Sequence, residues 1–127
     1  NALKSLKINK LSIFTPYTNE INKSVINYFE KEDIELSELS YFDLASDLDI
    51  GRVDPDYLFD VLTKIDLSNS DALFVSCTSL PVLSIIKELE KKINKVVLSS
   101  NQTLIWDTLK QIQFKKEING YGELFSS

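Results

Sequence analysis

The fold of this chain is best predicted from residues 72–81, which read Ala72-Leu73-Phe74-Val75-Ser76-Cys77-Thr78-Ser79-Leu80-Pro81. The first four residues form a continuous apolar run, which is typical of a central parallel strand covered on both faces. Ligands of α/β sheets bind beside the carboxyl ends of the strands, and Cys77 falls at that point. We therefore expect a central strand that ends in a thiol followed by hydroxyl residues.

Outside this stretch, runs typical of strands alternate with stripes typical of helices. Further apolar, β-prone runs occupy residues 10–14, 34–41 and 95–98. Apolar side chains recur at helical spacing within residues 21–29, 58–65, 82–89 and 104–112. Asp54-Pro55 supplies a helix start, whereas residues 45–52 are expected to form a polar loop. This order predicts an α/β fold, with three α-β-α layers around a four-stranded parallel sheet.

The composition excludes several classes of function. With 127 residues and a net charge of −5, the chain fits one domain and has no basic stripe for nucleic acid. No apolar run is long enough to span a bilayer, and one cysteine forms no internal disulfide, so a cytoplasmic location is expected. The chain has no histidine and no glycine-rich phosphate loop. We therefore expect no metal, nucleotide, nucleic acid or membrane to take part.

Two interpretations of Cys77 remain open from the residues alone. Without histidine, acid–base chemistry near neutral pH falls to a thiol, a carboxylate or a cofactor, and Cys77 is the one thiol. A helix that starts just behind Cys77 would favour an anion and lower a thiol pKa. A free cysteine is also commonly a small, buried core residue.

Four polar segments follow the predicted strands and are expected to share one edge of the sheet. They are Thr15-Pro16-Tyr17, residues 45–52, Cys77-Thr78-Ser79 and Ser99-Ser100-Asn101. Three of them are expected to lead directly into helix N-termini, which suits a small anion such as a carboxylate. Each segment alone is also explained as an ordinary helix cap, for example by the capping box of Ser99 and Gln102.

The stretch around Cys77 resembles the second cysteine motif of the maleate cis–trans isomerases. These enzymes belong to the aspartate/glutamate racemase superfamily together with the arylmalonate decarboxylases. Residues 15–17, 99–102 and 120–124 are also similar to that group, in the same order. The resemblance implies a fold of two α/β lobes facing each other across a cleft, without a cofactor. Residues 1–127 match the second lobe, so we expect them to be a single lobe of a longer protein.

The resemblance also implies roles for individual residues. Cys77 would deliver or remove a proton at the substrate α-carbon, and Tyr17 would hydrogen-bond a substrate carboxylate. Thr78 and Ser79 would offer backbone N–H groups to that carboxylate. Asp47 stands where the isomerases carry an asparagine, and its negative charge would repel a dianion. The remaining predicted binding residues are Thr15, Pro16, Ser99, Ser100 and Asn101.

The function predicted on these grounds is an isomerase or racemase of a small carboxylic acid. The missing N-terminal lobe would be its partner, so this lobe alone should be inactive and could self-associate into a homo-oligomer. The chain begins at Asn1 and contains no methionine, which also favours a piece of a longer protein. The alternative is a non-catalytic module that binds a small carboxylate or has a regulatory role.

Overall fold

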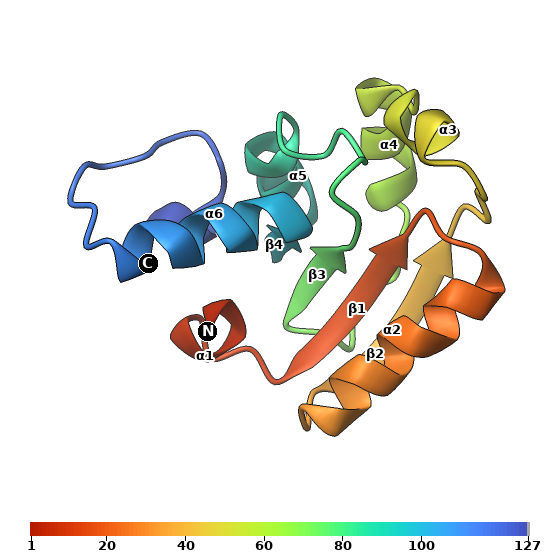
Figure 1. Ribbon diagram of the computed structural model, residues 1–127, viewed down its shortest axis with the longest axis horizontal. Coiled ribbons are helices and arrows are strands. Elements are labelled where there is room, and N and C mark those ends of the chain that lie inside the picture. The colour runs from red at the N-terminus through yellow and green to blue at the C-terminus, as the bar shows by residue number, and fades with distance from the viewer. Residues whose placement is uncertain (127) are drawn as a thin grey trace.

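The computed structural model describes residues 1–126 and is built around a parallel sheet of four strands. These strands are β1 (Lys10–Thr15), β2 (Glu35–Tyr41), β3 (Ala72–Val75) and β4 (Val96–Ser99). They lie in the order β2-β1-β3-β4 and all pair in parallel (Figure 1). The predicted α/β class is confirmed, and the carboxyl ends of all four strands share one edge.

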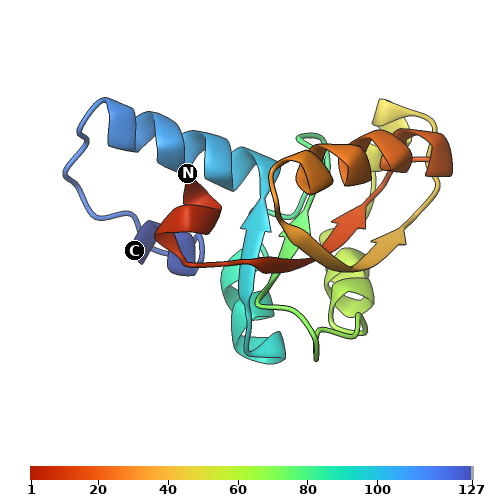
Figure 2. The same ribbon diagram turned by 90° about the horizontal axis from the view of Figure 1, so that it is seen from below.

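Helices cover both faces of this sheet (Figure 2). One face carries α1 (Ala2–Ser5), α2 (Asn19–Lys31) and α6 (Ser100–Gln111). The opposite face carries α4 (Pro55–Leu62) and α5 (Ile86–Ile93). Side chains of β3 alternate between two buried clusters: Leu73 and Val75 pack on the α4 side, and Ala72 on the α6 side. Burial on both faces explains why this strand is continuously apolar.

Two predicted helix starts are confirmed by their hydrogen bonds. The Asp54 carboxylate accepts from the backbone N–H groups of Asp56 at 2.9 Å and Tyr57 at 3.0 Å, which caps α4. Ser99 and Gln102 form the reciprocal capping box at the start of α6, with distances of 3.2 and 3.1 Å. Each cap involves only residues within three positions of one another, so distant packing does not alter it.

Three predictions from the pattern of apolar and polar residues are wrong in detail. The helix expected from residue 82 begins only at Ile86, so eight residues separate Cys77 from the α5 N-terminus. Val82 is buried ahead of that helix, within an irregular connection. The loop expected at residues 45–52 contains a short helix, α3 (Asp47–Gly51), whose Ile50 is buried. In α2, Ile21 is 48% exposed, and Asn22 takes the buried position beside it.

The β4 strand forms an edge of the sheet, and side chains cover its backbone. The Glu90 carboxylate accepts from the Val97 N–H at 3.0 Å and from the Glu123 N–H at 2.9 Å. The Gln102 amide donates to the Tyr121 carbonyl at 2.6 Å. These bonds dock the C-terminal segment, including the 3-10 helix η1 (Glu123–Ser126), beside β4. Such covering protects an edge strand from pairing with another chain.

Within residues 1–126, no helix has both the length and the apolar character needed to cross a bilayer.

Candidate functional site

The structure brings all four predicted segments together at the carboxyl edge of the sheet. Backbone bonds join the exits of neighbouring strands, as in Leu44 N–H to Pro16 carbonyl at 2.8 Å and Ser76 N–H to Phe14 carbonyl at 2.9 Å. The loop after β3 is tied to the start of α6 by side chains of that helix. The edge is therefore a single polar surface built by β1, β2, β3 and β4 together.

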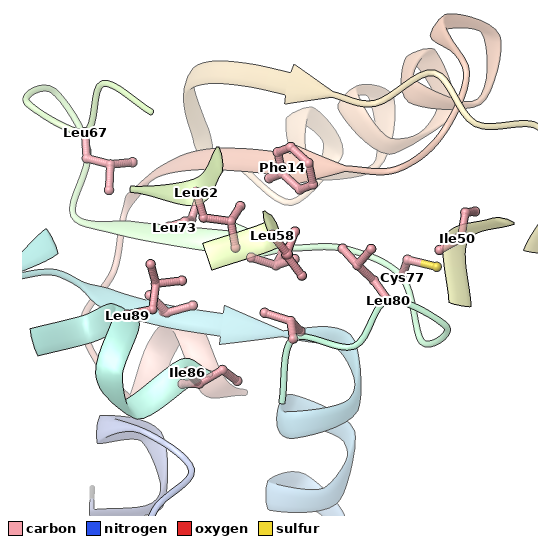
Figure 3. Close-up of a cluster of buried hydrophobic side chains, with 13 residues drawn as sticks. Phe14, Ile50, Leu58, Leu62, Leu67, Leu73, Cys77, Leu80, Ile86 and Leu89 are labelled. Atoms are coloured by element: carbon pink, nitrogen blue, oxygen red, sulfur yellow. The ribbon is translucent and has the colours of Figure 1, made fainter. Parts of the chain in front are cut away.

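Cys77 is strained as well as buried. Its φ of 112° lies in the region that favours glycine, and a non-glycine residue there costs about 1–3 kcal/mol of strain. Its backbone N–H donates to the Ser100 hydroxyl oxygen at 3.1 Å, which fixes the turn against the first residue of α6. The side chain is 6% exposed and packs in the cluster that contains Ile50 and Leu80 (Figure 3). Strain of this kind is typical of functional positions, although the packing also fits a core cysteine.

Tyr17 places its hydroxyl beside the thiol. Burial, followed by a hydrogen bond with Cys77, raises the pKa of Tyr17 to about 12, while a bond with Ser76 acts in the opposite direction. The negative charge of Asp47 also raises it. The phenol therefore stays protonated near neutral pH and keeps an O–H to donate. Asp47 itself is exposed and is the first residue of α3.

Two of the predicted binding hydroxyls have partners inside the fold. The fully buried Thr15 hydroxyl pairs with the Asn22 side-chain oxygen and accepts from the Tyr17 N–H at 3.3 Å. The Asn22 amide also donates to the Tyr17 carbonyl at 3.4 Å. Ser99, equally buried, is used as the cap of α6. These side chains hold the turns in shape, and Pro16 contributes the carbonyl that receives Leu44.

The loop after Cys77 presents donors that the fold does not use. Thr78 and Ser79 are exposed, and within residues 1–126 neither backbone N–H donates to another protein atom. Asn101 holds this loop by donating its amide to the Thr78 carbonyl at 2.9 Å. Backbone N–H groups in such a turn can bind a carboxylate. The arrangement thus combines a thiol, a phenol and two vacant donors.

Sequence reasoning missed Asn22 and Ser76. Asn22 is a polar residue at a buried position of α2, spaced three and seven residues before Val25 and Phe29. That spacing was available as a signal, because a polar side chain on a core stripe needs a specific partner. Ser76 lay within the motif, but nothing in the sequence indicated that it faces Tyr17.

Two hollows of the surface lie away from Cys77. One of about 430 Å³ is bordered by α1, α2 and α6, with Leu3, Tyr28 and Leu104 among its lining. Another of about 430 Å³ is lined by Trp106 and the residues after α6. Neither includes Cys77. Among the described residues, His, Cys, Asp and Glu form no group of three or more suited to a metal ion.

The fold is that of one half of the maleate isomerase and arylmalonate decarboxylase structures. The maleate cis–trans isomerase of Nocardia farcinica, solved as a cysteine-to-serine mutant with a covalently bound succinylcysteine intermediate, superposes with a TM-score of 0.92 at 22% identity. That match covers 98% of this chain and 51% of the other. A liganded mutant of arylmalonate decarboxylase superposes with a TM-score of 0.90 at 23% identity, covering 98% and 55%.

The chain belongs to the arylmalonate decarboxylase family, whose sequence model matches residues 1–125. It is 27% identical to the maleate isomerase of Geobacillus stearothermophilus and 28% identical to that of Alcaligenes faecalis, over 127 residues in each case. These matches cover 99% of this chain and 51% and 50% of the relatives. The arylmalonate decarboxylase of Bordetella bronchiseptica is 25% identical, with 98% and 53% covered. The chain thus spans about half the length of the curated relatives it matches.

Proposed function

We propose that this chain supplies half of the active site of a cofactor-independent isomerase or racemase that acts on a small carboxylic acid. One observation carries the proposal: the only thiol of the chain lies at the carboxyl edge in a strained turn, near enough to the Tyr17 hydroxyl to raise the pKa of Tyr17. The vacant N–H groups of Thr78 and Ser79 lie on the same loop and suit a carboxylate. Family membership supports the same class of chemistry.

In this mechanism Cys77 moves a proton at the substrate α-carbon. When the thiol gives its proton to a carbanion-like carbon, a thiolate remains, and the Tyr17 O–H donates to it. The reverse transfer removes the α-proton and restores the thiol. Because the pKa of Tyr17 is about 12, the phenol serves as a donor in both directions and does not itself lose its proton. General acid–base transfer of this kind contributes about 10²–10⁴-fold to a rate.

The carboxylate would be held by the Thr78 and Ser79 N–H groups, which could also stabilise an enolate-like intermediate. Thr15, Asn22 and Ser99 act as positioning residues, because their side chains hold the turns that present Tyr17 and the start of α6.

A second lobe of a longer protein would complete the site. The two hollows of about 430 Å³ on this chain do not include Cys77, so a facing lobe would supply the enclosure that a small substrate needs. In the isomerase version, a thiolate from the second lobe adds to the double bond of the substrate. Cys77 then protonates the resulting carbanion, the single bond rotates, and Cys77 takes a proton back as the first thiolate leaves. A succinylcysteine intermediate, as found in the Nocardia farcinica isomerase, is the species that such an addition produces.

The test is an assay of the full-length encoded protein against maleate, aspartate, glutamate and an arylmalonate. Cys77→Ala should abolish turnover of whichever acid is converted. Ser84→Ala is the matched control, since Ser84 is exposed in the same connection between β3 and α5. Activity retained in Cys77→Ala would remove the thiol from the mechanism. Binding of an acid by the wild-type protein without any turnover would favour the non-catalytic binding module instead.

A further inference from the structure

Asp47 lies at the edge of the site, and the residues before and after it in the sequence are both anchored there. Before it, the Leu44 N–H donates to the Pro16 carbonyl at 2.8 Å, next to Tyr17. After it, Ile50 of the same short helix packs in the cluster that contains Cys77 (Figure 3). The first residue of α3 therefore lies between two segments that are each anchored beside the site.

The surroundings of Asp47 give its charge no partner. The ion pairs in residues 1–126 are Lys10 with Glu35 and Lys91 with Glu88, and neither lies at this edge. Among the four edge segments, Arg52 is the one basic residue, and it follows α3 without an ion pair to Asp47 in the described chain. The Tyr17 phenol already feels the negative charge of this carboxylate. An exposed anion without an ion pair thus lies within electrostatic range of the Tyr17 hydroxyl, on the short helix whose Ile50 packs in the cluster with Cys77.

We propose that Asp47 selects substrates that carry a nitrogen donor, an amide or an ammonium group, where a dicarboxylate would carry its second carboxylate. This inference rests on the proposed function, because it assumes that one carboxylate is bound by Thr78 and Ser79. An ionised carboxylate only accepts hydrogen bonds, so it pairs with an N–H and repels a second carboxylate. The substrates of this protein are therefore monocarboxylates with a nitrogen group at the other end.

The experiment compares maleate with its half amide, which share a carbon skeleton and differ in one terminal group. Both are assayed with the full-length wild-type protein, with Asp47→Asn and with Asp49→Asn. Asp49 is the matched control, since it is an exposed aspartate on the same helix. The wild-type protein should prefer the half amide in kcat/KM by about tenfold or more, as expected for a site that pairs one polar group. Asp47→Asn should shift the preference towards maleate, and Asp49→Asn should leave it unchanged.

A second measurement covers the case in which neither compound is turned over. Both are then compared as protectants of Cys77 against alkylation by iodoacetamide, followed at that residue by mass spectrometry. Better protection by the half amide, lost in Asp47→Asn, supports the inference. Equal or better conversion or protection with maleate in the wild-type protein overturns it, while leaving the proposed thiol chemistry standing. If neither compound is converted and neither protects Cys77, the inference fails, and the proposed function is decided separately by the assay of the four acids above.

Discussion

Replacing Gly122 by alanine tests how the C-terminal segment is docked onto the sheet. Gly122 has a φ of +91°, and a Cβ built there would stand 2.6 Å from the Ile86 Cγ2 and 2.9 Å from the Gln102 Nε2. It would also lie 3.0 Å from the Glu90 Oε1. Ile86 is fully buried, and the other two side chains hold the segment through hydrogen bonds. None of these neighbours can move without losing a contact.

Gly120 provides a matched control for the size of the effect. Its φ is +97°, but a Cβ there would meet nothing within 4 Å. Both alanine variants pay about 1–3 kcal/mol for the left-handed backbone. Only Gly122→Ala adds overpacking, about 1–3 kcal/mol, and the loss of a hydrogen bond, about 1 kcal/mol. The free energy of unfolding should therefore fall by about 2–4 kcal/mol more in Gly122→Ala than in Gly120→Ala, which sums the two additional costs.

Equilibrium urea unfolding of both variants measures this difference. Hydrogen exchange supplies a second readout, because the Val97 and Glu123 amides both donate to Glu90. If the alanine at residue 122 only detaches the segment, the Glu123 amide should exchange faster while the Val97 amide keeps more protection. Equal stability of the two variants, with unchanged exchange at both amides, would refute the account of close packing at Gly122.

Three further outcomes follow from the site and its supports. Spectrophotometric titration should show Tyr17 ionising near pH 12. Cys77→Ala should lower the pKa of Tyr17 but leave it above 10, because burial is the larger cause of the raised pKa. Ionisation of Tyr17 at the ordinary pKa in the wild-type protein would contradict this account. Since the folded pKa is raised, the stability that this phenol contributes is complete below pH 10 and is lost as the pH rises through 12. Asn22→Ala should lower the free energy of unfolding by about 1–3 kcal/mol in a urea titration, since it leaves the buried Thr15 O–H donor without an acceptor, whereas the exposed Asn19→Ala should have little effect. Asp54→Ala should cost about 1 kcal/mol by removing the cap of α4, and an unchanged melting temperature would show that the cap is dispensable.

Local signals in the sequence predicted the fold well. The apolar run at residues 72–75 identified a strand buried on both faces, and Asp54 and Ser99 marked two helix starts. Each of these signals depends on a few adjacent residues and the backbone they cap, so no distant contact was needed to interpret them.

The wrong predictions fall in segments where apolar residues are buried outside the expected helices. Val82 and Ile86 have helical spacing, but the chain between them is irregular and buries both against the sheet. The spacing of apolar residues shows which residues are buried, but it does not show the backbone dihedral angles of the residues between them. In the same way, α3 forms in a polar segment because Ile50 has a core position to fill.

The sequence by itself predicted the order of the four strands and of the longer helices, and it placed Cys77, the one thiol, at the carboxyl edge of the sheet. These follow from hydrophobic periodicity and from the rule that parallel strands end together. Only the tertiary structure decided what surrounds the thiol: the hydroxyl of Tyr17, the Ser100 oxygen on its backbone and the nearby charge of Asp47. These residues are between 23 and 60 positions away from Cys77 in the chain. Their contacts depend on how distant segments pack, which the spacing of residues within each segment does not encode.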